Sequence, residues 1–240
     1  MSVTIVLFTM LGAVVGSLIA WLGRALMDNP ARRARTQCDL CRRKLEWWEL
    51  IPIFSYLGLG GKCRSCGTSI MLTDWSMEVI GAILFGVGAW RFIVGRDFVW
   101  WLLLATGTML LFYIDVRWMI VPRSFAVVVA FVALLSQWTI TNFAIVLLAA
   151  LLGTIFYFFL YVISNGRWVG DGDVGLGFIV GAAAGDILHL GYTLLIAHSI
   201  GALVATGLII MHKKKLGEAL PMGAFLLPAL WVVVLWSGWR

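Results

Sequence analysis

The cysteines are the first residues whose spacing indicates a definite chemistry. The chain has four, and they form two Cys-x-x-Cys pairs separated by a connector of 21 residues. A two-residue spacer lets both thiolates of a pair reach one metal ion, and two such pairs complete the tetrahedron that zinc prefers. Four thiolates leave no open coordination position, so such a site would be structural. The spacing therefore predicts a zinc site formed by Cys38, Cys41, Cys63 and Cys66.

Disulfides or a redox couple are the alternative use of these cysteine pairs. Neither pair lies in the strand–helix–strand pattern that surrounds redox motifs of this kind. Arginines and lysines flank the cysteines and favour thiolates electrostatically. The orientation argued below places the pairs on the reducing side of a membrane, where disulfides are rare. We expect a module of this small size to need its metal in order to fold.

Two aspartates lie beside apolar segments in a way that suggests acid–base chemistry. Asp115 ends the apolar segment 110–115, and Asp173 closes the sequence Gly170-Asp-Gly-Asp173 just before another apolar run. Ionisable groups near membrane depth are costly and by default functional. Two carboxyl groups brought together share a proton, so one can act as a base toward water while the other donates to a carbonyl. Independent capping of two helices is the alternative, and the residues alone leave both interpretations open.

The composition requires a membrane to position these residues. The chain of 240 residues is 62% hydrophobic and only 12% charged, whereas a soluble domain has about 25% charged residues. There is too little polar surface for a water-soluble globule of this size. The net charge of +6 does not indicate nucleic-acid binding, because the basic residues flank apolar runs, as topology determinants do.

The apolar residues are gathered into eight runs, with seven helices as the competing count. Each run is near the length of about 20 residues that a spanning helix needs. The runs cover Val3–Leu26, Met77–Val94, Phe98–Ile114, Phe125–Ile140, Phe143–Ile163, Val174–Leu190, Tyr192–Met211 and Ala219–Trp236. We therefore predict an all-α polytopic membrane protein of about eight transmembrane helices, with a zinc-ribbon-like module between the first and the second.

The predicted organisation has three parts: the first transmembrane helix (1–26), the four-cysteine module (27–75) and a membrane core of about seven helices (76–240). With eight spans, 15 of the 18 basic residues fall on the side of the module, and Arg91, Arg96 and Arg240 fall on the other. Cytoplasmic loops carry the excess of Lys and Arg. The module, Asp115 and Asp173 are therefore predicted to face the cytoplasm, with both termini outside.

Together these residues resemble the type IV prepilin peptidase family, the membrane aspartic proteases that carry a Gly-x-Gly-Asp motif. The likeness covers nearly the whole chain and is closest to the members that serve competence pili. The matching segments are Gly16-Ser17, the two cysteine pairs, Glu49–Leu57, Gly61–Gly67, Glu78, Asp115 followed by Pro122, Gly170–Asp173 and Leu220–Phe225. The chain departs from the family pattern at Ala20, Arg123 and Gly175, which puts inferences about substrate contacts in doubt.

The resemblance implies a bifunctional enzyme of the bacterial inner membrane. Such an enzyme cleaves the short basic leader of type IV prepilins or pseudopilins after a glycine at the cytoplasmic face, and then N-methylates the new N-terminal residue with S-adenosylmethionine. It also implies that Asp115 and Asp173, rather than Asp171, are catalytic. It makes Glu78 a candidate for the methyltransferase, with an ordinary role at the start of a helix as the alternative. No Gly-rich strand–turn–helix motif marks a site for S-adenosylmethionine.

Two other classes of function are compatible with parts of the sequence. A membrane assembly or docking protein would use the zinc module to bind a partner, and its aspartates would only cap helices. A transporter would use the acids as a proton relay, but it usually needs charges near mid-span and internal repeats. Neither is visible, since the acids lie at the ends of runs. The expected partners are prepilin substrates and the lipid bilayer, with no nucleic acid.

Overall fold

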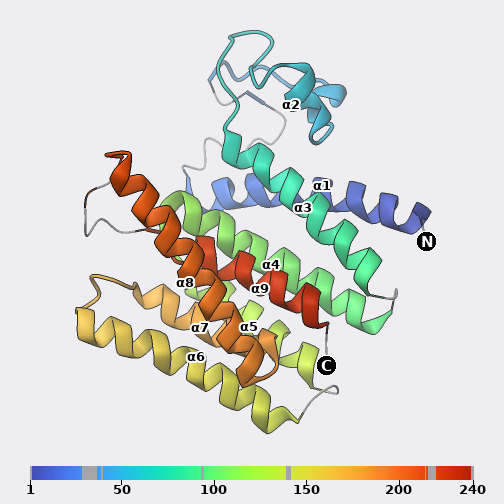
Figure 1. Cartoon of the computed structure of the whole chain (residues 1–240). Coiled ribbons are helices and arrows are strands. Elements are labelled where there is room, and N and C mark those ends of the chain that lie inside the picture. The colour runs from blue at the N-terminus through green and yellow to red at the C-terminus, as the bar shows by residue number, and fades with distance from the viewer. Residues whose placement is uncertain are drawn as a thin grey trace. The chain divides into compact units, whose positions relative to one another are not determined.

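The computed structural model describes residues 2–28, 37–38, 40–92, 95–138, 142–213, 215 and 220–238 (Figure 1). Segment 29–36, Lys214, Arg240 and the predicted run ends Val94, Ile140 and Ala219 lie outside the described residues. The chain divides into two compact units, Met1–Trp90 (unit 1) and Arg91–Arg240 (unit 2), each described by itself. The described residues are mainly helical, and their extended pairing is limited to two isolated bridges.

Unit 1 contains two long helices and the cysteine-bearing segment between them. Its elements are α1 (Ser2–Met27), η2 (Trp47–Leu50), α2 (Phe54–Gly58) and α3 (Leu72–Arg91), whose last residue belongs to unit 2. Helices α1 and α3 approach through glycines. A β-carbon on Gly12 would collide with the carbonyl oxygen of Gly81, and one on Gly16 with that of Met77. This is the close backbone approach that small residues four positions apart permit in membrane helices.

Unit 2 consists of six helices in the described part of the chain. They are α4 (Arg96–Trp118), α5 (Arg123–Gln137), α6 (Phe143–Ser164), α7 (Asp171–Ala184), α8 (Ile187–Ile210) and α9 (Gly223–Ser237). Helix α7 packs against α5, α6, α8 and α9, while α4 packs against α5 and α9. Helix α9 therefore contacts both α4, which carries Asp115, and α7, which carries Asp173.

Small residues bring α6 and α7 together along their length (Figure 1). A β-carbon on Gly153 would strike the carbonyl oxygen of Gly177, and one on Gly181 would strike that of Ala149. The four residues form two pairs with spacings of four on each helix, so the backbones touch where larger side chains would hold them apart. This contact fixes the helix that begins with the Gly-Asp-Gly-Asp sequence.

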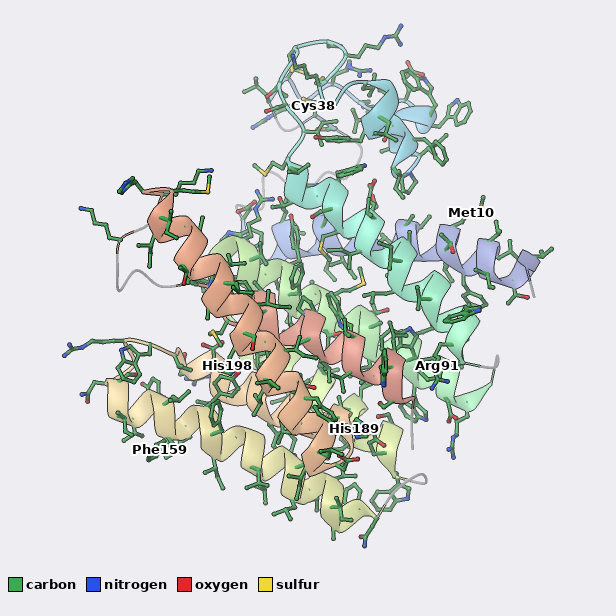
Figure 2. All side chains as sticks on the ribbon, viewed as in Figure 1. Met10, Cys38, Arg91, Phe159, His189 and His198 are labelled. Carbon is green, nitrogen blue, oxygen red and sulfur yellow. The ribbon has the colours of Figure 1, made fainter. Side chains whose placement is uncertain are left out.

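The predicted all-α polytopic membrane fold is confirmed. The described part of each apolar run is mainly helical, and five of the described helices, α1, α3, α4, α6 and α8, are long and apolar enough to cross a membrane. Helices α5, α7 and α9 are shorter, with 15, 14 and 15 residues. Met10 on α1 and Phe159 on α6 each expose 61% of their surface (Figure 2). Apolar side chains this exposed along long helices are expected where lipid, not water, surrounds the protein.

The predicted boundary between the sixth and seventh runs is wrong. The sixth run was expected to continue from Val174 to Leu190, but α7 ends at Ala184. Gly185 takes a left-handed conformation that ends the helix, and the Asp186 side chain accepts a hydrogen bond from the backbone N–H of His189 as the N-cap of α8. Residues 187–190 therefore open α8.

Candidate functional site

The two cysteine pairs fold into two similar loops. In the first loop the backbone N–H of Arg42 donates to the carbonyl oxygen of Cys38 over 2.9 Å, and in the second the N–H of Gly67 donates to that of Cys63 over 2.9 Å. Arg42 and Gly67 both adopt positive φ angles, 55° and 69°. The same local geometry, repeated about each Cys-x-x-Cys, turns both sulfurs of a pair to one side.

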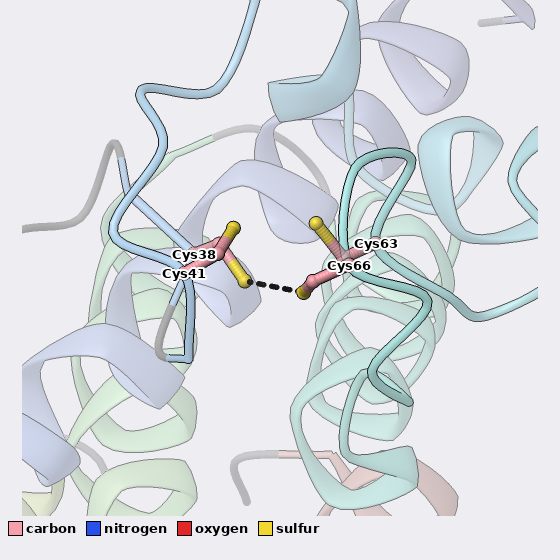
Figure 3. Close-up of side chains that lie close together, drawn as sticks. All are labelled: Cys38, Cys41, Cys63 and Cys66. Carbon is pink, nitrogen blue, oxygen red and sulfur yellow. Dashed lines mark hydrogen bonds between the residues drawn. The ribbon is translucent and has the colours of Figure 1, made fainter.

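The four cysteine sulfurs converge on one point (Figure 3). All four lie within 4.8 Å of one another, and the sulfurs of Cys38 and Cys66 are 3.7 Å apart. Two thiolates bound to one zinc ion at tetrahedral angles are about 3.8 Å apart, given zinc–sulfur bonds of about 2.3 Å. The donor set and the spacing both fit zinc. Cys38, Cys41, Cys63 and Cys66 would hold it, which is the set that the sequence predicted.

The backbone around the second pair favours a thiolate. The N–H groups of Cys66 and Ser65 lower the pKa of Cys63 to about 6. Burial has the opposite effect on the pKa of Cys38, which it raises. A site with at least one thiolate at neutral pH is ready to bind a metal ion, because the thiolate is the ligand.

An ion pair between a buried glutamate and a half-buried arginine supports the cysteine cluster. Glu49 is 7% exposed, and its carboxylate accepts a hydrogen bond from Arg43 at 2.6 Å and another from the backbone N–H of Glu46 at 2.8 Å. The Arg43 guanidinium also interacts with the Cys63 sulfur. The hydrogen bond that the Arg43 side chain donates to Glu49 lowers the pKa of Glu49 below its usual range. Glu49 thus acts on the metal site through Arg43, a role that the sequence analysis did not identify.

Glu78, the candidate for the methyltransferase, lies in the first half of α3. Its Oε2 atom accepts a hydrogen bond from the backbone N–H of Ile53 at 2.7 Å. Ile53 has a φ of +66°, which is unusual for a β-branched residue. The contact joins the cysteine-bearing segment to α3 within unit 1, so the carboxylate of Glu78 has a fixed position.

Asp115 and Asp173 lie on different helices of unit 2 and are brought near each other. Asp115 is in the last turn of α4 and is 4% exposed, and Asp173 is in the first turn of α7 and is 8% exposed. The carboxyl groups are close enough to interact electrostatically. Gly172 permits this approach, since a β-carbon there would lie 2.7 Å from Cβ of Val121, just beyond α4.

The capping interpretation of Asp173 is also partly correct. Its Oδ2 atom accepts a hydrogen bond from the backbone N–H of Gly170 at 3.0 Å, so the carboxylate caps its own helix. Asp115 has no such role at a helix start. Its Oδ2 atom is buried and has no hydrogen-bond partner among the described residues. The Asp173 carboxylate is therefore held at the start of its own helix, whereas one oxygen of Asp115 is left without a hydrogen bond in the described part of the chain.

The start of α9 completes the surroundings of Asp115. The backbone amides of Gly223 and Ala224 interact with the Asp115 carboxyl group. A helix N-terminus presents such N–H groups to a negative charge. The sequence analysis singled out Leu220–Phe225 only through the family resemblance. The signal that it could have used is a proline and a glycine directly before an apolar run.

The other acidic residue of the Gly-Asp-Gly-Asp sequence lies in different surroundings. The Asp171 side chain is 65% exposed and pairs with Arg123 at 2.7 Å, and the Arg123 side chain is 88% exposed. Arg123 is one of the positions at which the chain departs from the family pattern. The ion pair joins the start of α5 to the start of α7 at the surface. Asp171 is therefore an exposed, ion-paired residue next to the buried pair, and its charge still acts electrostatically on Asp173.

Comparisons with known proteins show which family the chain resembles. A family model described as the bacterial peptidase A24 N-terminal domain matches residues 10–92. The chain is 30% identical over 209 residues to the prepilin leader peptidase/N-methyltransferase of Stutzerimonas stutzeri, covering 84% of this chain and 72% of the relative. The protein of the same name from Pseudomonas putida is 30% identical over 225 residues, with the same coverage. That from Bacillus subtilis is 28% identical over 194 residues, covering 78% and 75%. No solved structure matches the chain.

Proposed function

Because the chain belongs to the prepilin leader peptidase/N-methyltransferase family, we propose that it cleaves the short basic leader of type IV prepilins or pseudopilins after a glycine. It then N-methylates the residue that cleavage exposes, using S-adenosylmethionine. The observation that carries the peptidase proposal is the electrostatic contact between the buried carboxyl groups of Asp115 and Asp173. Each comes from a separate helix, and two close carboxyl groups share one proton.

The pair can hydrolyse a peptide bond without any other catalytic group. The ionised carboxylate takes a proton from a water molecule, whose oxygen attacks the scissile carbonyl carbon while the protonated carboxyl donates to the carbonyl oxygen. The tetrahedral intermediate then collapses. The carbon–nitrogen bond breaks, and the leaving nitrogen accepts a proton from the first carboxyl group. The amides at the start of α9 hold Asp115 in place for this step.

We also propose where the enzyme lies and which part of the chain has which role. The enzyme lies in the bacterial inner membrane, with the cysteine module and the carboxyl pair facing the cytoplasm. Residues 1–26 anchor the module, 27–75 form it around a structural zinc ion, and 76–240 form the peptidase core. Supporting this, the four cysteine sulfurs converge within unit 1, whereas both aspartates belong to unit 2.

Mass spectrometry of a co-expressed prepilin tests both activities in one measurement. With the unchanged enzyme we expect a prepilin that lacks its leader and carries one N-terminal methyl group. Asp115→Asn and Asp173→Asn should each leave the leader in place at normal enzyme level. Asp171→Asn is the matched control and should cleave, because the Asp171 side chain is exposed and paired with Arg123 at the surface. Normal cleavage by either of the first two variants would refute the assignment, and an uncut leader with the unchanged enzyme would favour a docking protein.

A further inference from the structure

Helix α6 carries a buried tyrosine that the peptidase chemistry described above does not use. Tyr157 is fully buried, and its hydroxyl group has no hydrogen-bond partner among the described residues. Its ring packs against α7, because a β-carbon on Gly177 would lie 2.7 Å from the ring. Burial of a hydroxyl group without a partner is costly, and such groups in native proteins usually bind a buried water molecule or a ligand. The hydroxyl of Tyr157 therefore needs a partner when the enzyme is at work.

The packing of α6 against α7 places Tyr157 level with Asp173. The two glycine contacts between these helices share one register, in which four residues further along α6 correspond to four residues further back on α7. Gly153 lies against Gly177, so one more step in this register brings Tyr157 opposite Asp173. The Asp173 carboxyl group also acts electrostatically on Tyr157. The tyrosine thus lies beside one of the two carboxyl groups of the peptidase site.

Helix α8 adds a histidine that has a second unpartnered atom. His198 lies in the middle of α8 (Figure 2), and its ring stacks on that of Tyr157 with centroids 6.0 Å apart and planes inclined by 23°. Its Nδ1 atom lies 2.7 Å from the carbonyl oxygen of Leu194 and donates to it, since a carbonyl oxygen only accepts. In the neutral ring Nε2 is then an acceptor, and it is buried without a partner in the part of the chain that the structure describes. The two stacked rings therefore offer a hydroxyl group and an acceptor nitrogen.

We propose that Tyr157 and His198 bind one buried water molecule that fixes the position of Asp173, an inference that rests on the peptidase activity proposed above. The water molecule accepts a hydrogen bond from the Tyr157 hydroxyl, and it donates one to Nε2 of His198 and one to the Asp173 carboxylate. Three partners are the usual number for a buried water molecule. The Asp173 carboxylate also accepts from the backbone N–H of Gly170, so a second hydrogen bond fixes its plane. Tyr157 and His198 are thus positioning residues, and the two aspartates remain the catalytic ones.

The kinetics of leader removal by the purified full chain in detergent test this role. We expect Tyr157→Phe to lower kcat about 10- to 100-fold, as loss of a hydrogen bond that reaches a charged group does, and to leave KM for the prepilin unchanged. Its melting temperature should not fall, because the ring and its packing are kept. Tyr192→Phe is the matched control, since it removes the same hydroxyl group from an exposed tyrosine of α8, and it should cleave normally.

A double-mutant cycle tests whether the two residues hold the same water molecule. His198→Phe keeps a ring on α8 but removes Nε2, so it should lower kcat by a factor similar to that of Tyr157→Phe. The variant that carries both substitutions should lose no more than the more damaging single variant, because the shared water molecule is already gone. Losses that multiply would show that the two residues act independently and would overturn the proposal.

The outcomes separate this inference from the proposed function. If the unchanged enzyme cleaves and Tyr157→Phe cleaves at the same rate, the water site is refuted and the peptidase assignment stands. A higher KM with an unchanged kcat would mean that the hydroxyl binds the substrate, and a lower kcat explained by a lower melting temperature would mean that it only supports the fold. Either result overturns the proposal. No cleavage by the unchanged enzyme would refute the peptidase activity and this inference with it.

Discussion

A β-carbon on Gly223 would lie 2.7 Å from Oδ2 of Asp115 and 3.0 Å from the side chain of Leu176. The first residue of α9 therefore touches both the helix that carries one carboxyl group and the helix that carries the other. Only a residue without a side chain lets α9 begin this close to Asp115. The same approach brings the amides of Gly223 and Ala224 to the carboxyl group.

We expect Gly223→Ala to reduce leader cleavage by about 100-fold, because a displacement of about 1 Å in a catalytic group can cost that much. The added methyl group must push either the Asp115 carboxyl group or the start of α9 away. The rate of leader removal from a purified prepilin in detergent measures the effect.

Gly191→Ala is the matched control for that substitution. It adds the same methyl group within α8, where a β-carbon has no other atom within 4 Å. It should cleave at the normal rate. If Gly223→Ala matched the control, the contact between α9 and Asp115 would have no part in catalysis.

The contact of Gly177 on α7 with Gly153 on α6 tests the helix packing that positions Asp173. A β-carbon on Gly177 would lie 2.7 Å from the Tyr157 ring and against the backbone of Gly153. We expect Gly177→Ala to lower stability by about 1–3 kcal/mol, the usual cost of overpacking, and to slow cleavage by moving α7. Thermal unfolding in detergent and the cleavage rate measure the two effects.

Gly175 lies two residues before Gly177 on the same helix, and Gly175→Ala is the matched control for Gly177→Ala. A β-carbon at Gly175 meets no other atom within 4 Å. Since alanine is favoured over glycine in a helix by about 1 kcal/mol, this variant should be as stable as the unchanged protein or slightly more so. Equal losses in the two variants would mean that α7 tolerates no change at all, and the specific contact with α6 would not be the cause.

The sequence allowed the local features of the fold and of the site to be predicted. A long apolar run has few options other than a membrane helix, and the described part of every run is mainly helical. A Cys-x-x-Cys pair turns both sulfurs to one side through its own short loop, so the convergence of the four sulfurs follows from spacing. The electrostatic contact of Asp115 with Asp173 required the further assumption that two distant aspartates meet.

The features of the fold and the site that could not be predicted are of two kinds. Some depend on contacts between distant segments, and others depend on single residues within an apolar stretch. The break between α7 and α8 falls at Gly185 and Asp186 inside a continuous apolar stretch, where hydrophobicity gives no warning. The role of Gly223 beside Asp115 joins residues more than 100 positions apart along the chain. The link from Glu49 through Arg43 to Cys63 likewise exists only after the module has folded.

Removal of the metal is expected to separate the two activities. The purified protein should contain about one zinc ion per chain, as a closed four-thiolate site requires, and replacing Cys38 and Cys63 together by serine should remove it. Because both cysteines belong to unit 1 while Asp115 and Asp173 belong to unit 2, methyl transfer should fall by a larger factor than cleavage. Metal analysis and mass spectrometry of the prepilin N-terminus provide the two measurements. A metal-free variant that methylates normally would contradict this expectation.

The ion pair between Glu49 and Arg43 predicts how zinc affinity depends on a residue that does not touch the metal. Glu49→Gln should weaken zinc binding by about 10- to 100-fold, as loss of a group that supports a metal ligand typically does. Competition with a chelator measures the affinity. Glu46→Gln, which changes an exposed glutamate in the same segment, is the control and should leave it unchanged.

The effect of Glu49→Gln on zinc affinity has a defined pH dependence. Arg43 lowers the pKa of Glu49 below its ordinary value of 4.5, so the folded protein favours the ionised carboxylate. The contribution of Glu49 is therefore complete above pH 4.5 and is lost only as the pH falls through the lowered pKa. The ratio of zinc affinities between the unchanged protein and Glu49→Gln should be the same at about pH 6 and about pH 8. A ratio that shrinks between about pH 8 and about pH 6 would show that the Glu49 carboxylate takes up a proton in that range, contrary to a strong ion pair with Arg43.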